Sequence, residues 1–177
     1  MNGKDALAAI QYLQSRGVRL WLDGGWAVDA LLGEQTRPHD DVDLAVELAD
    51  REAYEAAVAD AGYEFLYYDP DNDAEDGTHL NWVVRDSAGR ELDVHIVDTS
   101  VTQILPDGTE AYGAMPYPVG SLDGVGSIEG VEVPCITPEF LVAFHTGYGL
   151  RDKDFHDVRA LCERFGIELP AEYRTHP

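Results

Sequence analysis

The stretch Asp41–Val46, DVDLAV, constrains the fold more than any other part of this sequence. Aspartate alternates with apolar residues at its start, which is typical of a β-strand with one buried face. Side chains two apart on a strand share a face, so the carboxylates of Asp41 and Asp43 would lie close together, while Asp40 would point the other way. Neighbouring carboxylates repel each other, and burial strengthens the repulsion unless a cation offsets it. The pattern therefore indicates either a site for a hard cation such as Mg²⁺ or a solvated strand face.

A third aspartate belongs to a later apolar strand. Asp93 stands between Leu92 and Val94 in ELDVHIV, so its side chain would point away from theirs. An acid among apolar neighbours costs free energy unless it is paired or bound to a metal. If this strand lies beside Asp41–Val46, three carboxylates converge, and one or two metal ions could bridge phosphate oxygens there. Asp93 would then be the general base for an attacking hydroxyl.

A glycine pair precedes these acids. The predicted strand Val18–Leu22 ends just before Gly24 and Gly25, and a helix is predicted over 26–33. Glycine lets a phosphate approach the backbone closely, and the start of a helix offers free N–H groups. Many ordinary strand–helix turns also contain two glycines, so the glycine pair indicates a phosphate site only in combination with the aspartates.

The remaining chain mixes helical and strand patterns. A loop rich in acids is expected over 69–77, and a long segment rich in Gly and Pro over 106–130 is of the kind that often carries function. These patterns predict an α+β fold with a mixed sheet flanked by helices, in a single domain over 1–177 whose C-terminal part, from about 137, is helical. Further helices are predicted over 4–17, 49–62, from 137 and over 154–166, with a strand over 63–68 and hairpins over 78–97 and 127–136.

Composition narrows the class of partner and the compartment. The 177 residues carry 12 Lys and Arg against 34 Asp and Glu, a formal charge of −22, which disfavours binding of DNA or RNA. Solubility or a salty cell interior would explain most of this acidity, but not acids clustered beside apolar strands. No apolar run is long enough for a bilayer, and the N-terminus does not look like a signal peptide, so we expect a cytoplasmic location. Cys135 and Cys162 are expected to be small core residues.

Two longer stretches resemble a known family. The segment WLDGGWAVDALLGEQTRPHDDVDL, Trp21–Leu44, resembles antibiotic nucleotidyltransferases of the polymerase-β-type superfamily, which include small lincosamide enzymes and aminoglycoside adenylyltransferases. Those enzymes carry a similar Trp-x-x-Gly-Gly-Trp stretch and a basic TR-x-H before the acidic pair. The segment VPCITPEFLVAFHTGYGLRDKDFHDVRAL is similar to the C-terminal part of the small lincosamide enzymes. The likeness extends from about Leu20 to Leu161, with 69–72 and 108–125 not distinctive.

The resemblance implies a nucleotidyltransferase fold and a role for each candidate site residue. Arg37 is a phosphate contact or a surface charge, His39 is expected to be solvated, and His145 is expected in the core. Asp154 and Asp157 are expected to cap the last helix or to pair with neighbours. The implied metal ligands are Asp41, Asp43 and Asp93, with Asp93 also the catalytic base, and the implied nucleotide-binding residues are Gly24, Gly25, Arg37 and Lys153.

The resemblance also implies a reaction. It is the Mg²⁺-dependent transfer of a nucleoside monophosphate, AMP from ATP above all, to a hydroxyl of a small cationic antibiotic. A lincosamide such as lincomycin or clindamycin is the favoured acceptor, and an aminoglycoside is the alternative. A same-fold enzyme that modifies a protein side chain or a tRNA end is another alternative, and the net charge opposes tRNA. A non-catalytic small-molecule binder would not need all three aspartates. A homodimer is compatible with the sequence, since Tyr112 and Tyr117 could line a pocket or an interface.

Overall fold

A computed structural model describes residues 1–69, 73–74, 76–147 and 149–174. Residues 70–72 and 75 of the acidic loop expected over 69–77 lie outside these ranges. No helix in the described part combines the length and the apolar character needed to span a bilayer. The α-helices are α1 (Gly3–Ser15), α2 (Gly24–Leu32), α3 (Arg51–Asp60), α4 (Pro138–Phe144) and α5 (Asp152–Phe165). The strands are β1 (Leu20–Leu22), β2 (Asp41–Glu47), β3 (Glu64–Tyr68), β4 (Asn81–Arg85), β5 (Glu91–Ile104), β6 (Glu110–Ala114), β7 (Gly124–Ile128) and β8 (Val131–Cys135).

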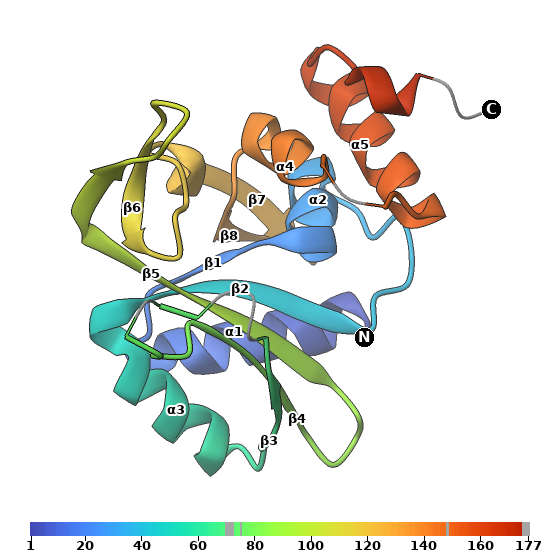
Figure 1. Cartoon of the computed structure of the whole chain (residues 1–177). Coiled ribbons are helices and arrows are strands. Elements are labelled where there is room, and N and C mark those ends of the chain that lie inside the picture. The colour runs from blue at the N-terminus through green and yellow to red at the C-terminus, as the bar shows by residue number, and fades with distance from the viewer. Residues whose placement is uncertain (70–72, 75, 148, 175–177) are drawn as a thin grey trace.

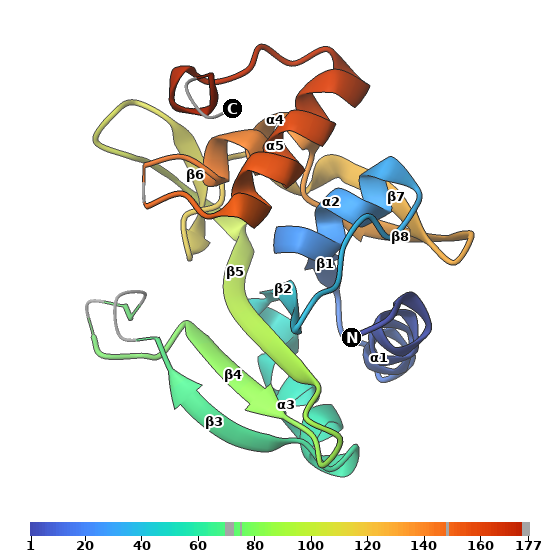
Figure 2. The same cartoon turned by 90° about the vertical axis from the view of Figure 1, so that its right-hand side faces the viewer.

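The strands form one mixed sheet in the described part of the chain. Its order is β3-β4-β5-β2-β1-β8-β7, and β6 pairs with β5 outside this path. The β2–β5 and β1–β8 pairs are parallel, and the other pairs are antiparallel. Helices α1 and α3 lie in the lower half of Figures 1 and 2, with β3 and β4, whereas α2, α4 and α5 lie in the upper half, with β6 and β7. This arrangement confirms the mixed sheet flanked by helices that the sequence predicts.

Local sequence accounts for the helices that frame the site. Ala6, Ile10 and Leu13 repeat at helical spacing on α1, and all three are buried against the sheet. Helix α2 starts earlier than the predicted residue 26. Asp23 is its N-cap, with a side chain that accepts a hydrogen bond from the backbone N–H of Gly24. The two glycines therefore form the first turn of the helix.

The region 106–130 departs most from expectation. It contains β6 and all of β7, although no long periodic element is evident there from sequence. Strand β5 also continues to Ile104, beyond the predicted hairpin end at residue 97. The extension of β5 and the formation of β6 have one cause, because β6 pairs with β5 between Val97 and Ile104, with a register irregularity between Asp98 and Thr102. This tertiary pairing stabilises strands that the local pattern only weakly favours.

Candidate active site

Two of the predicted metal ligands face each other across a parallel strand pair. In the register of β2 and β5, Asp43 lies opposite Asp93 and Asp41 lies opposite Glu91. Directly paired residues point to the same face of a sheet, so Asp41, Asp43 and Asp93 share one face. The three aspartates therefore lie on one face of two adjacent strands.

The acids of this face shift one another's protonation. Burial raises the pKa of Asp43 well above its usual value, and the charges of Asp41, Asp93 and Asp23 raise it further, while Lys153 lowers it. Burial also raises the pKa of Asp93, against the opposing effects of His95 and of a hydrogen bond from Asn81. Such shifts mark a place where negative charge is costly unless a cation is nearby.

The donor set fits a hard cation completed by a substrate. No group of three or more His, Cys, Asp or Glu side chains in the described ranges already has the arrangement of a metal centre. The oxygens of Asp41 and Asp43 are nevertheless the type that Mg²⁺ prefers, and Mg²⁺ commonly takes one or two carboxylates together with substrate phosphates. The raised pKa values of Asp43 and Asp93 fit such a cation.

Asn81 holds the predicted base in place, although it is not among the residues predicted from sequence. Its side-chain Nδ2 donates to Asp93 Oδ1 at 2.5 Å and to the backbone oxygen of Val94 at 2.9 Å. Asn81 is buried at the start of β4, opposite His95 in the strand pairing. A polar amide inside the apolar run HLNWVV was the available signal, because a buried amide needs partners.

The two glycines are required by close contacts. Gly24 has a positive φ of 54°, and a Cβ built there would lie 2.0 Å from Asp43 Oδ2. A Cβ on Gly25 would lie 2.4 Å from Arg37 Nη2 and 2.6 Å from His39 Nδ1. Larger side chains would displace the carboxylate and the basic loop, so both positions fix the geometry at the start of α2.

Arg37 is anchored by a carboxylate far away in the sequence. Its Nε lies 2.9 Å from Asp157 Oδ1, its Nη2 lies 2.6 Å from Asp157 Oδ2, and its Nη1 donates to the backbone oxygen of Pro38. Three of the five guanidinium N–H groups are therefore engaged within the protein. Asp157 pairs as predicted, and Asp154 accepts hydrogen bonds from Arg151 in a capping box at the start of α5.

The prediction that His39 is solvated is wrong. Its side chain is buried, and Nε2 lies 2.5 Å from Asp29 Oδ2, while the ring packs on Trp26. Asp29 also accepts hydrogen bonds from the backbone and hydroxyl of Thr36. This buried pair fixes the loop before β2 and so fixes where Arg37 and the acidic strand begin.

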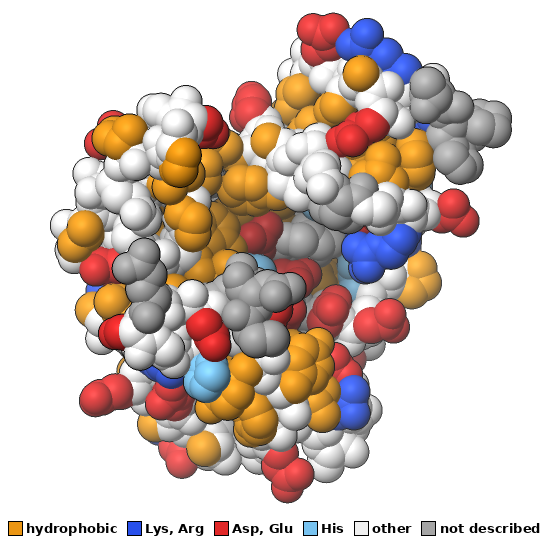
Figure 3. All heavy atoms as spheres, viewed as in Figure 1, with side chains coloured by type: hydrophobic (Ala, Val, Ile, Leu, Met, Phe, Trp, Pro, Cys, Tyr) orange, Lys and Arg blue, Asp and Glu red, His pale blue; other side chains and the backbone are white. Residues whose placement is uncertain are grey.

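Two hollows meet at Asp43. The polar hollow, about 300 Å³, is lined by Gly25, Arg37, Asp41, Lys153 and neighbouring polar groups. The apolar hollow, about 390 Å³, is lined by Met115, Pro116, Tyr117 and Phe144 together with Asp23 and His95. Gly24, Asp43 and His145 line both hollows. Figure 3 shows acidic side chains inside the depression and basic ones on one rim.

The hollows have different chemistry. Lys153 is exposed on the first turn of α5, so its ammonium can meet an anion that enters the polar hollow. The apolar hollow presents aromatic and aliphatic surface beside two polar side chains, which suits a ligand with both apolar and polar parts. His145 is buried, as expected, and its Nδ1 lies 2.7 Å from the backbone oxygen of Leu141.

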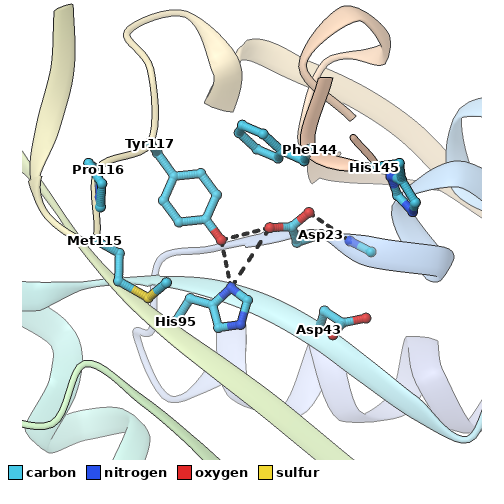
Figure 4. Close-up of a pocket in the computed structure, with 9 residues that line it drawn as sticks. Asp23, Asp43, His95, Met115, Pro116, Tyr117, Phe144 and His145 are labelled. Atoms are coloured by element: carbon cyan, nitrogen blue, oxygen red, sulfur yellow. Dashed lines mark hydrogen bonds and ion pairs between the residues drawn. The ribbon is translucent and has the colours of Figure 1, made fainter. Parts of the chain in front are cut away.

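A hydrogen-bonded chain crosses the apolar hollow. The Tyr117 hydroxyl donates to Asp23 Oδ2 at 2.6 Å and lies 2.7 Å from His95 Nδ1 (Figure 4). His95 Nε2 lies 3.6 Å from Asp93 Oδ1. The sequence left open whether Tyr117 lines a pocket or an interface, and the structure places it in the pocket wall. Its partners lie 22 and 94 residues away in the sequence, so no local signal could have identified them.

Comparisons with known proteins agree with this geometry. The family model described as aminoglycoside-2''-adenylyltransferase matches residues 6–161. A lincosamide resistance protein of Staphylococcus haemolyticus is 26% identical over 167 residues, 89% of this chain and 92% of that protein. A 2''-aminoglycoside nucleotidyltransferase of Escherichia coli is 62% identical over 29 residues, 16% of each chain.

Two solved structures share the architecture. The lincomycin-bound lincosamide antibiotic adenylyltransferase LnuA has a TM-score of 0.71 at 24% identity and covers 89% of this chain and 94% of its own. ANT(2'')-Ia in complex with adenylyl-2''-tobramycin has a TM-score of 0.67 at 26% identity, with coverage of 94% and 92%. The nucleotidyltransferase fold expected from the sequence is thereby confirmed.

Proposed function

Because this chain belongs to the aminoglycoside-2''-adenylyltransferase family and is a nucleotidyltransferase, we propose that it transfers AMP from ATP to a hydroxyl of a small cationic antibiotic. The observation that carries the proposal is the meeting of the two hollows at Asp43, opposite Asp93. A triphosphate in the polar hollow and an acceptor in the apolar hollow would bring their reacting atoms to these carboxylates.

Each residue of the site has a task in this reaction. Asp41 and Asp43 would hold Mg²⁺ with Asp93, and the bound ion would offset the charge of the triphosphate and activate the acceptor hydroxyl. Lys153 on the rim would contact the phosphates, and Gly24 leaves the backbone open to them. Arg37 would keep the loop before β2 in place through Asp157, with two N–H groups left for a phosphate oxygen.

The chemical step conserves every atom of ATP and acceptor. Asp93 takes the proton of the acceptor hydroxyl, and the oxygen forms a bond to the α phosphorus. The bond from that phosphorus to the bridging oxygen of the leaving group breaks in line, which releases pyrophosphate. The products are the adenylylated acceptor and pyrophosphate, and the Asp93 proton passes to solvent.

A lincosamide is the acceptor that the apolar hollow favours. Met115, Pro116, Tyr117 and Phe144 offer a wall for the apolar parts of such a molecule, and Asp23 supplies a carboxylate at its edge. The match to the lincosamide resistance protein also extends over 89% of this chain. The surrounding acidity, with a formal charge of −22, would attract the basic amine of the acceptor.

An aminoglycoside is the second candidate. It is favoured by the family model and by the 62% identity to the 2''-aminoglycoside nucleotidyltransferase over 29 residues. An aminoglycoside carries several ammonium groups and little apolar surface, so it would draw on the acidic rim more than on the aromatic wall.

One assay separates these candidates. The protein is incubated with ATP labelled at the α phosphate, Mg²⁺, and lincomycin, clindamycin, tobramycin or kanamycin in turn. We expect a labelled lincosamide with the wild type, and a rate lower by about 10² to 10⁴ with Asp93→Asn, which loses the base. Asp107→Asn is the matched control, because Asp107 is exposed and its hydrogen bond to Thr109 lies outside the site. Label on aminoglycosides alone would favour the second candidate, and label on none, with ATP still bound, would refute both acceptor classes.

A further inference from the structure

We propose that the buried carboxyl group of Glu47 is a positioning group for the acceptor wall, because it holds Thr99 where the pairing of β5 with β6 becomes irregular. The inference deepens the proposed function and rests on it in one respect, that the apolar hollow receives the acceptor. The wall residues Met115, Pro116 and Tyr117 follow β6 directly and line that hollow (Figure 4). Neither Glu47 nor Thr99 is among the residues that line it, so they would act on the acceptor through the wall.

Glu47 is a buried acid that the proposed chemistry does not use. It is the last residue of β2, and alternate residues of a strand share a face, so its side chain lies on the same face as Asp41 and Asp43. Glu47 is 2% exposed, and its Oε2 accepts a hydrogen bond of 2.5 Å from the hydroxyl of Thr99, 52 residues later in the chain. A buried carboxyl group that loses such a partner costs free energy. The contact therefore ties the end of β2 to the middle of β5.

The contact falls on a bulge in the β5–β6 ribbon. Asp98 pairs with Gly113 and Thr102 pairs with Tyr112, so residues 99–101 of β5 stand between two pairs that are adjacent on β6. Extra residues of this kind form a β-bulge, which bends its strand, and bulges next to active sites re-aim side chains. The carboxyl group on β2 therefore holds the first residue of the bulge.

The opposite strand fits the bulge closely. A Cβ on Gly113 would lie 3.3 Å from the Cβ of Val101 and 3.4 Å from that of Asp98, so β6 packs against the bulge without a side chain in between. The next residue, Ala114, has a φ of 56°, which a residue with a Cβ seldom adopts. A backbone in this region persists only where its surroundings hold it. The fit between the two strands therefore determines how the chain leaves β6.

The acceptor wall is fixed on both sides of the bulge. The backbone N–H of Met115 donates to the backbone oxygen of Ile96, before the bulge, at 2.9 Å. The backbone N–H of Tyr112 donates to the backbone oxygen of Tyr117 at 2.8 Å, and Tyr112 pairs with Thr102, just after the bulge. The bend at the bulge thus sets the angle between the two ends of the wall. A change in that bend should alter contacts with the acceptor, while the first half of β5 stays in register with β2.

Steady-state kinetics test whether this contact positions the wall. Thr99→Val keeps the shape of the side chain but removes its hydroxyl, so we expect KM for the acceptor to rise about 10-fold, while KM for ATP and kcat stay within about twofold. Thr99→Ser keeps a hydroxyl and should stay close to the wild-type KM. Thr102→Val, at an exposed position of the same strand, is the matched control. Equal losses in kcat and in both KM values, or no change at all, would refute the positioning role.

Hydrogen exchange measures the same effect without an acceptor. In Thr99→Val we expect the backbone amides of Tyr112 and Met115 to exchange about 10-fold faster, while those of residues 92–95 keep wild-type rates. Gly113→Ala presses on the bulge from β6 and should give the same two results, so it tests the bend even if Thr99→Val does not fold. Wild-type exchange in a folded variant would overturn the inference. A wild type that modifies no acceptor would refute the proposed function instead, and the exchange rates would still decide whether the β2 contact holds the ribbon.

Discussion

The carboxylate of Asp43 packs directly on the backbone of Gly24, where a Cβ would lie 2.0 Å from Oδ2. Asp43 lines both hollows, so this contact fixes the position of a side chain at the place where they meet. Any displacement of the carboxylate would move a predicted metal ligand away from its partner strand. In the proposed reaction, the spacing between nucleotide and acceptor thus depends on the absence of a side chain at Gly24.

Replacement of Gly24 should therefore abolish activity. We expect Gly24→Ala to lower kcat/KM by at least about 100-fold, because the added methyl group displaces Asp43. Gly62→Ala is the matched control, since Gly62 also has a positive φ but a methyl group there would meet no atom of another segment within 4 Å. Gly62→Ala should cost about 1–2 kcal/mol of stability and keep its activity. Equal activity in the two variants, by initial-rate assay, would contradict the close contact at Gly24.

Neutralising Asp43 should stabilise the metal-free protein while it inactivates the enzyme. Burial and three neighbouring carboxylates raise the pKa of Asp43, so its charged form destabilises the fold. We expect Asp43→Asn to raise Tm in EDTA at pH 8, where about 2–4 °C corresponds to about 1 kcal/mol in a chain of this size. The same variant should lose Mg²⁺-dependent transfer. A lower Tm in calorimetry would show that the carboxylate is not repelled.

The Arg37–Asp157 pair should contribute to stability far more than a surface pair. Asp157 is 1% exposed and Arg37 is 17% exposed, so Asp157→Asn leaves a poorly solvated guanidinium. We expect a loss of about 3 kcal/mol in the free energy of unfolding. Glu168→Gln is the control, because Glu168 and its partner Arg174 are 87% and 53% exposed, and this change should cost less than about 1 kcal/mol. Urea unfolding measures both, and similar losses would refute the distinction.

The cysteine thiols should be inert in the folded protein. Burial raises the pKa of Cys135 to about 12, and burial also raises the pKa of Cys162. A raised thiol pKa means that the reactive thiolate appears only as pH rises toward that value. At pH 8 we expect no reaction with a chromogenic disulfide reagent in native protein, and two thiols per chain in guanidinium. Rapid native labelling would contradict the burial of these residues.

Much of the site follows from sequence because it depends on strand periodicity. The alternation around Asp41 and Asp43 and the isolated Asp93 place three acids on one face once their strands are neighbours. The helix ends at Gly33 and Gly166 follow equally from local rules, since both glycines adopt the left-handed conformation.

The rest could not be deduced, because it depends on contacts between distant segments. From the sequence, Arg37 is expected to contact a phosphate or to lie on the surface. In the structure its guanidinium pairs with Asp157, which lies 120 residues away in the sequence. The burial of His39 depends on its contact with Asp29, which belongs to the preceding helix α2. Strand β6 forms only because β5 extends to meet it, which neither segment's pattern reveals.

The long strand β5 has a further consequence for how such enzymes diversify. Its first half, with Asp93, is held in register by β2, whereas its second half carries the ribbon with β6 that leads into Met115 and Tyr117. Under the proposed function, changes in the ribbon would alter the acceptor wall while the β2–β5 pair that carries Asp93 keeps its register. A single continuous strand thus places the proposed base and the approach to the proposed acceptor wall on separate stretches of the same backbone.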